Sequence, residues 1–390
     1  MTPITATAEL EAFCDRLADA PFIAVDTEFM RETTYWPKLC LIQAAGPDLA
    51  ANIDPLAEGL DLSPFLKLMA DPKIQKVFHA GRQDVEIFNN LGVIPKPLFD
   101  TQIAGMAAGF GEQIAYDALV RQMLKIDIDK SSRFTDWSRR PLSTAQLDYA
   151  LADVVHLAAL YPPLRERLEK EGRMAWVEEE MADLVDPANY DMNPDIAWKR
   201  LRPRRHTAKY MAVFKAVAAW RERTAQSRDQ PRGRILKDDA IDEVATQAPT
   251  DAEAMNRLRS VPKGFSTSRF GPDLLAAIRE ALSDPEANAP AVERPKGPAP
   301  NQATGAVVEL LKVLLKARAE EAGVASKLIA TVSDLEKIAL DDEADTPALT
   351  GWRKDAFGAD ALKVKRGELA LVLDGGRVRV VEVRRAPKPA

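Results

Sequence analysis

The sequence contains few of the residues that form disulfides or zinc sites. Its two cysteines, Cys14 and Cys40, lie in apolar surroundings, so we expect reduced core residues rather than a disulfide. Its three histidines, His79, His156 and His206, do not have the spacing of zinc ligands. These shortages argue against a disulfide-stapled protein and against a zinc protein.

Long apolar runs are also missing. No run approaches the roughly 20 residues of a membrane-spanning helix. Residues 1–7 lack the basic and apolar regions of a signal peptide. We therefore expect a cytoplasmic protein without a membrane partner. A chain of 390 residues is too long for one core, so two or three domains are expected.

The first acidic cluster is Asp26-Thr27-Glu28. It follows a short apolar run, which predicts a buried strand over residues 22–26. Because side chains alternate across a strand, Asp26 and Glu28 would point to the same face. An isolated Asp-x-Glu pair at the end of a strand more often belongs to a solvated turn without a function of its own.

Two further acidic positions lie in segments with helical patterns. Asp84 stands near the start of one, where a carboxylate can simply interact favourably with the helix dipole. Tyr149 and Asp153 are four residues apart in the helix predicted over 145–160, so they share one face. An ordinary amphipathic pair, with the tyrosine in the core, would look the same.

The four carboxylates together suggest more than each does alone. If they converged on one pocket, they would repel one another unless cations lay between them. Oxygen ligands suit Mg²⁺ or Mn²⁺ rather than zinc. The combination predicts metal-dependent phosphoryl chemistry on a polyanion.

Longer motifs surround these residues. Segments 22–31 and 35–43, segment 78–86, and segment 147–154 resemble, in this order, the three exonuclease motifs of the ribonuclease D family. The segments that resemble the approach to the third motif are 130–132, 135–137 and 140–143. Relatives that use histidine to orient the attacking water carry it where this chain has Asp148. Here Tyr149 stands instead, four residues before Asp153, the last Asp of the third motif. The chain therefore resembles the tyrosine branch of the family, and His79 is interpreted as structural.

The resemblance implies a ribonuclease H-like α/β fold and a 3′–5′ exoribonuclease. It implies two divalent metal ions, Mg²⁺ or Mn²⁺, on either side of the scissile phosphate. Asp26 would bridge them, Glu28 and Asp153 would complete one site, and Asp84 would hold the second ion largely through water. Tyr149 would orient the attacking water. The implied partner is RNA with a free 3′ end, in particular precursor transfer RNA, which would release 5′-mononucleotides.

Two alternatives remain open from the sequence. A DNA 3′–5′ exonuclease would share the carboxylates, although no polymerase-sized region accompanies them here. A non-catalytic RNA-binding scaffold could have kept the fold, although buried like charges are costly without metals. No obligate protein partner is evident in either case.

The net charge of −6 looks unsuited to RNA, but positive charge is concentrated between residues 198 and 236. Within this basic stripe we counted only Glu222 and Asp229 as opposing acids. Phosphate neutralisation requires such a stripe, although a solvated helical face would also fit. The candidate RNA contacts are Arg200, Arg202, Arg204, Arg205 and Lys209.

Segments rich in residues that break helices and strands, proline above all, divide the chain into four predicted parts. An exonuclease domain spans 1–186, a helical domain 195–283, and a proline-rich linker 284–301. Segments 236–241 and 261–265 resemble the HRDC domain, the small helical domain of RecQ-type helicases and ribonuclease D. Residues 302–385 resemble a second, diverged copy that ends in a β-hairpin over 368–383. We expect strands at 22–26, 39–44, 50–53 and 76–79, the first three antiparallel and the last after a crossover helix that contains residues 62–70.

Overall fold

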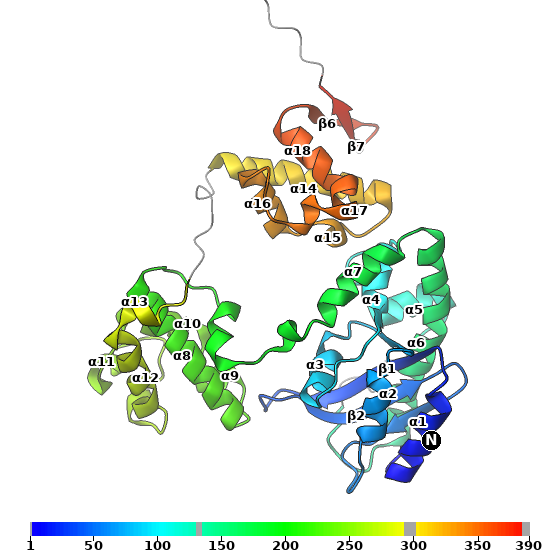
Figure 1. Cartoon of the computed structure of the whole chain (residues 1–390), viewed down its shortest axis with the longest axis horizontal. Coiled ribbons are helices and arrows are strands. Elements are labelled where there is room, and N and C mark those ends of the chain that lie inside the picture. The colour runs from blue at the N-terminus through cyan, green and yellow to red at the C-terminus, as the bar shows by residue number, and fades with distance from the viewer. Residues whose placement is uncertain (1, 130–134, 292–301, 384–390) are drawn as a thin grey trace, which may run out of the picture.

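A computed structural model describes residues 2–129, 135–291 and 302–383. It consists of an α/β domain followed by two helical units (Figure 1). Predictions on residues 130–132, on linker residues 292–301 and on residues 384 and 385 lie outside the described residues. None of the described helices combines the length and apolar composition of a membrane span.

The sheet of the α/β domain has the strand order β3-β2-β1-β4-β5. As predicted, the first three strands are antiparallel neighbours, and β4 pairs parallel to β1. β5 pairs parallel to β4 and was not predicted, because three residues give too short a pattern. The strands are β1 (Phe22–Met30), β2 (Lys38–Ala45), β3 (Ala50–Ile53), β4 (Gln75–Phe78) and β5 (Leu98–Asp100).

β1 is longer than predicted. Its apolar half is buried in the centre of the sheet, and we expected the strand to end at Asp26. Instead, pairing with β2 continues to Met30, with a bulge between Glu28 and Phe29. The parallel partner β4 pairs only as far as Ala24. Asp26 and Glu28 therefore lie inside a strand, beyond the point where one of its neighbours has ended.

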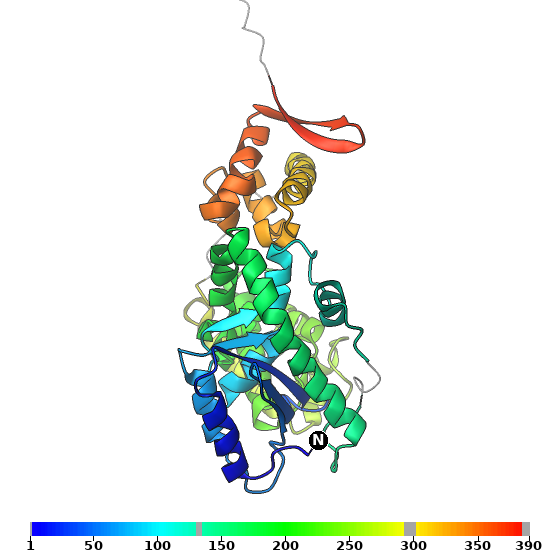
Figure 2. The same ribbon diagram turned by 90° about the vertical axis from the view of Figure 1, so that its right-hand side faces the viewer.

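Helix α6 (Thr144–Lys170) packs across the sheet (Figure 2). Ser143 and Gln146 form a capping box at its start, which fixes where the helix begins. It runs ten residues beyond the predicted end, through two prolines, because Leu164 and Leu168 in its last turns are buried in the core. The other helices of this domain are α1 (Thr7–Leu17), α2 (Ser63–Ala70), α3 (Arg82–Asn90), α4 (Thr101–Ala107), α5 (Tyr116–Leu124) and α7 (Met174–Leu184).

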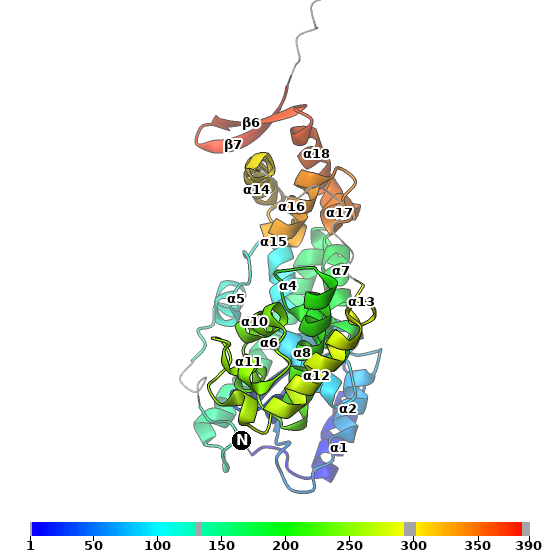
Figure 3. The same ribbon diagram turned by 90° about the vertical axis from the view of Figure 1, so that its left-hand side faces the viewer.

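Each helical unit has an apolar core of its own. The first comprises α8 (Ala208–Ser227), α9 (Arg232–Ile235), α10 (Asp238–Gln247), α11 (Ala252–Asn256), α12 (Gly271–Ser283) and α13 (Pro285–Asn288). The second comprises α14 (Gln302–Ala322), α15 (Ser326–Ile329), α16 (Val332–Leu340), α17 (Gly351–Arg353) and α18 (Ala359–Lys365). It ends in the predicted hairpin, β6 (Leu369–Asp374) and β7 (Arg377–Glu382), at its far end from the α/β domain (Figure 3).

The first helical unit is attached to the loop that follows β1, residues 31–37. Tyr35 of this loop is 5 % exposed and belongs to the core of that unit. Its hydroxyl donates to Glu222 at 2.5 Å and accepts from Arg232 at 2.8 Å. Glu222 is fully buried, and Arg200 and Arg232 neutralise it at 2.7 and 2.6 Å. Charge-assisted hydrogen bonds thus connect the strand that carries Asp26 with the helical unit.

The second helical unit is attached at α4 and α7. Leu328 of α15 is buried in the core of the α/β domain. The indoles of Trp176 and Trp352 stack with centroids 4.1 Å apart. Arg173 donates to the carbonyl oxygens of Ala107 and Ala322 at 2.7 and 2.6 Å. The two helical units are therefore packed onto the α/β domain by buried residues.

Gly109 should be required at this second junction. Its φ is +80°, and an added Cβ would lie 2.5 Å from the Gly323 carbonyl oxygen. Gly111 is a matched control, because its φ is +96° but nothing lies within 4 Å of its Cβ position. Both alanine variants carry backbone strain, and Gly109→Ala should lose roughly 1–3 kcal/mol more in unfolding free energy through the clash. Equal melting temperatures for the two variants would contradict this packing.

Candidate active site

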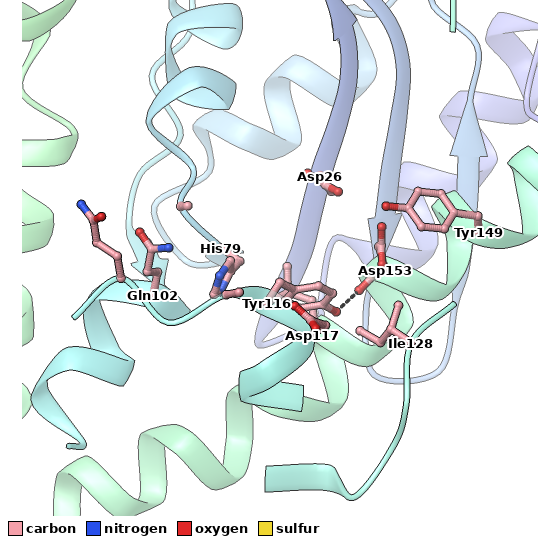
Figure 4. Close-up of a pocket in the computed structure, with 12 residues that line it drawn as sticks. Asp26, His79, Gln102, Tyr116, Asp117, Ile128, Tyr149 and Asp153 are labelled. Carbon is pink, nitrogen blue, oxygen red and sulfur yellow. Dashed lines mark hydrogen bonds between the residues drawn. The ribbon is translucent and has the colours of Figure 1, made fainter. Parts of the chain in front are cut away.

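A pocket of about 620 Å³ lies beside the second half of β1 (Figure 4). Asp26 enters it from β1, and Tyr149 and Asp153 enter it from successive turns of α6. The structure therefore brings together side chains from distant parts of the sequence, because Asp26 and Asp153 are more than 120 positions apart. Strand alternation and helix periodicity, as expected, place them on the faces that meet here.

Asp84 and Glu28 lie close to this group but do not line the pocket. Asp84 is buried in the first turn of α3, where Thr27 of β1 donates to its Oδ1 at 2.5 Å. Glu28 is partly exposed on β1, and its charge acts on the Tyr149 hydroxyl. Asp100 holds the turn before α3, because its carboxylate accepts from the N–H of Gly81 at 2.8 Å. The β1–α3 junction thus places Asp84 next to the strand that carries Asp26.

Little positive charge offsets the carboxylates of Asp26 and Asp84. None of the described residues that line the pocket is Lys or Arg. Burial raises the pKa of Asp26 to about 6. Burial and then the Asp26 charge raise the pKa of Asp84 to about 8. The pair is therefore costly to ionise in the protein alone, because two desolvated like charges lie close together.

This donor set fits divalent metal ions by its chemistry. Asp26, Glu28, Asp84 and Asp153 supply only oxygen atoms, which hard cations prefer. Within the described ranges, no three such side chains already surround one point, so the carboxylates do not form a closed cage.

Removing one of these carboxylates should change how stability depends on pH. The pKa of Asp84 is raised from 3.8, so its stabilising effect is present at low pH and is lost as the pH rises from about 4 through about 8. In chelator, Asp84→Asn should therefore gain stability relative to the wild type as the pH increases. Melting temperatures of both proteins at pH 5 and pH 8 test this, and a difference that does not change with pH would contradict the burial of this charge.

Tyr149 is held as a neutral phenol. Burial, followed by the charges of Asp153 and Glu28, raises the pKa of its hydroxyl above the usual range. Its ring lies 6.3 Å from that of Trp137 in the loop before α6. That loop is fixed by Arg140, which pairs with Asp54 at 2.6 Å. Tyr149 can therefore donate a hydrogen bond at neutral pH but is unsuited to accept a proton as a base.

The pocket wall contains residues that the sequence did not reveal. The Tyr116 hydroxyl donates to the main-chain carbonyl oxygen of Asp153 (Figure 4). Gln102 and Asp117 also line the pocket. No motif marks these positions, because they approach the carboxylates only after α4 and α5 have packed. His79, interpreted as structural, does bond Thr101 at 2.9 Å, yet its side chain is also part of the wall.

The basic stripe is more heavily neutralised than the sequence suggested. Within residues 198–236 the only acids are Glu222 and Asp229, but acids from outside the stripe also fold onto it. Three of its arginines pair with such acids: Arg221 with Asp238 at 2.5 Å, Arg223 with Asp195 at 3.1 Å and Arg204 with Asp242 at 3.6 Å. Arg202, Arg205 and Lys209 are exposed, and no ion pair holds them in the described part of the chain.

Comparisons with known proteins agree with this geometry. A family model described as 3′-5′ exonuclease matches residues 1–169, and one described as HRDC domain matches residues 211–278. A protein from Granulibacter bethesdensis named ribonuclease D is 51 % identical, over 97 % of this chain and 96 % of the relative. One of the same name from Nitrobacter hamburgensis is 52 % identical, over 98 % and 100 %. The crystal structure of Escherichia coli RNase D, described as an exoribonuclease involved in structured RNA processing, matches with a TM-score of 0.79 and 27 % identity, over 94 % and 99 % of the two chains.

Proposed function

Because the chain belongs to the ribonuclease D family and is a 3′–5′ exoribonuclease, we propose that it trims the 3′ ends of precursor transfer RNA by two-metal-ion hydrolysis. The observation that supports the mechanism most strongly is that Asp26 shares the pocket wall with Tyr149 and Asp153, lies close to the buried Asp84, and has no Lys or Arg among the described residues of that wall. The DNA exonuclease and the inactive scaffold that the sequence left open are less well supported, since relatives along the whole chain carry the name ribonuclease D.

We assign the metal ions, Mg²⁺ or Mn²⁺, to Asp26, Glu28, Asp84 and Asp153. When bound, they would supply an activated water and stabilise charge on the leaving 3′ oxygen. Asp26 and Asp153 lie on the wall of the pocket, and Asp84 and Glu28 lie close to them. The predicted set thus becomes one site in this proposal, and these four side chains would hold the ions.

The two tyrosines have different roles in this proposal. Tyr149, one helical turn from Asp153, orients the attacking water through its hydroxyl, because it remains protonated at neutral pH. Tyr116 acts indirectly, because its hydroxyl donates a hydrogen bond to the main-chain carbonyl oxygen of Asp153 and does not contact a reacting atom. Tyr116 is therefore a positioning residue.

RNA contact by the first helical unit is proposed for Arg202, Arg204, Arg205 and Lys209. All four are exposed, and Arg204 keeps a 75 % exposed side chain although Asp242 lies 3.6 Å away. Arg200, also predicted as a contact, pairs with the buried Glu222, and we assign it to the domain junction. These residues directly precede the HRDC match, which begins at residue 211.

Degradation of a short single-stranded RNA with and without Mg²⁺ tests the proposal, with the matched DNA strand as a control. We expect one-nucleotide shortening of the RNA from its 3′ end, dependent on Mg²⁺, with release of 5′-mononucleotides. Equal degradation of the DNA would favour the DNA exonuclease. Binding of RNA without any shortening would favour the scaffold.

The cellular substrate needs a separate experiment. Sequencing RNA 3′ ends from cells with and without the protein should show unprocessed 3′ extensions on precursor transfer RNA when the protein is missing. Such a role would place the protein in the cytoplasm. Unchanged transfer RNA ends would contradict the proposed substrate without contradicting the exonuclease activity.

A further inference from the structure

Three exposed side chains, Trp36, Arg228 and Arg269, and the partly buried Phe270 lie at the junction between the α/β domain and the first helical unit, outside the pocket. We call these four residues the junction patch. Trp36 belongs to the loop after β1, and the other three residues belong to the helical unit. No part of the mechanism above uses them.

Trp36 is presented to solvent on a fixed backbone. Its side chain is among the exposed large hydrophobics, with 36 % exposure. Asp229 Oδ1 accepts from the main-chain N–H groups of both Tyr35 and Trp36, each at 3.0 Å. The indole also meets the buried Tyr35 ring edge-on, with centroids 4.7 Å apart. An exposed indole held in this way loses little freedom when another ring stacks on it.

Two arginines flank Phe270. The guanidinium carbons of Arg228 and Arg269 lie 5.1 and 4.9 Å from the ring centroid. Both side chains are exposed, and within the described ranges neither has a carboxylate partner, unlike Arg221 and Arg232 nearby. A guanidinium that lies against a ring keeps its N–H groups free for a phosphate.

Contacts join the two halves of the patch. Arg228 directly precedes Asp229, which binds the main chain at Trp36, and Arg228 also lies over Phe270. Residues from distant parts of the sequence therefore form one surface. β1 leads straight into the loop that carries Trp36, so the patch lies beyond the end of the strand that carries Asp26 and Glu28.

We propose that the junction patch binds single-stranded RNA upstream of the 3′ end, with a base stacked on Trp36 and phosphates paired with Arg228 and Arg269. Aromatic rings combined with cations are the means by which proteins hold single strands without reading sequence. An acidic protein partner would use the arginines alone and would not need the indole. The inference rests on the proposed function, because it takes the substrate of the pocket to be RNA.

The test measures binding of a fluorescein-labelled, unstructured oligoribonucleotide to the full-length protein in chelator, by anisotropy. Trp36→Ala should weaken binding by about fivefold or more, in line with the stacking of one base. Trp36→Phe keeps a ring and should restore most of the affinity. The double variant R228E/R269E should weaken binding and reduce the slope of log affinity against log salt by about 1.4, for two phosphates on a single strand.

The control is the double variant K67E/K316E, which makes the same charge change at exposed lysines away from the patch. It should leave affinity and salt slope nearly unchanged. All variants should cleave a diribonucleotide, which has no upstream strand for the patch to bind, at the wild-type rate. Wild-type affinity in Trp36→Ala would overturn the proposal, and so would equal losses in the two double variants. Lost affinity in R228E/R269E with none in Trp36→Ala would also overturn it, because the arginines would then contact phosphates without any base stacked on the indole. A wild-type protein that cleaves no RNA would instead contradict the proposed function.

Discussion

Replacing Asp26 with asparagine is expected to abolish metal-dependent removal of 3′ nucleotides while leaving the fold intact. An amide is a poor bridging ligand, and loss of a direct ligand should exceed the 10- to 100-fold that loss of an outer partner typically costs. Turnover should therefore fall by more than about 100-fold. The variant should also melt at a higher temperature than the wild type in chelator at pH 8, because burial disfavours the ionised Asp26 carboxylate.

Asp117→Asn is the matched control for this variant, because Asp117 also lines the pocket but is not assigned to a metal ion. It should lose less than tenfold in turnover. Single-turnover rates at saturating Mg²⁺ compare the two variants directly, and anisotropy in chelator checks that both still bind RNA. An Asp26→Asn enzyme that works as well as Asp117→Asn would remove Asp26 from the proposed site.

Replacing Tyr149 with phenylalanine is the second large expected effect. The substitution keeps the ring that packs near Trp137 and removes only the hydroxyl, so the melting temperature should change little. Loss of one positioned hydrogen bond to the attacking water should slow single-turnover cleavage by roughly 100-fold, at the lower end of the range for acid–base and positioning groups.

Tyr161→Phe provides the comparison for Tyr149→Phe. Tyr161 lies on the same helix, and Arg165 donates to its hydroxyl at 2.8 Å, away from the pocket. This variant should cleave RNA at the wild-type rate. If the two variants are equally active, Tyr149 is a packing residue and another group must orient the water.

The parts of the site that could be predicted from sequence are those fixed by local periodicity. Alternation along a strand places Asp26 and Glu28 on one face, and helical spacing does the same for Tyr149 and Asp153. The predicted end of β1 at Asp26 was wrong, because pairing with β2 prolongs the strand to Met30. Such pairing depends on a distant segment and not on the local sequence. Tyr116 could not be found, since it reaches Asp153 only through the packing of α5 on α6.

The charges of the first helical unit show a similar limit. In the sequence, the arginines from 198 to 236 look like one continuous positive stripe. In the fold, Glu222 is buried among Arg200, Arg232 and Tyr35, and Asp238 approaches Arg221 from the next helix. Net charge along a sequence therefore overstates the positive surface, because ion pairs form between residues on different helices.

The junctions also change how the helical units are understood. A catalytic domain ending near residue 186 was predicted as a separate part, yet Leu328 completes its core and Tyr35 is buried in its neighbour. The loop that contains Tyr35 continues from the strand that carries Asp26. Displacement of the first helical unit should therefore disturb the geometry of β1 as well as the affinity for RNA.

The most direct test of the account is the Mg²⁺ dependence of single-turnover cleavage, measured on one RNA labelled at its 5′ end, in the wild type and in Asp84→Asn. Two cooperating ions predict that the wild-type rate rises with about the square of the Mg²⁺ concentration below saturation, while products shorten one nucleotide at a time from the 3′ end. Asp84→Asn should require far more Mg²⁺ and should lose the second-order dependence. Cleavage that is independent of metal, or an identical Mg²⁺ dependence in both proteins, would contradict the assignment of these carboxylates to two metal ions.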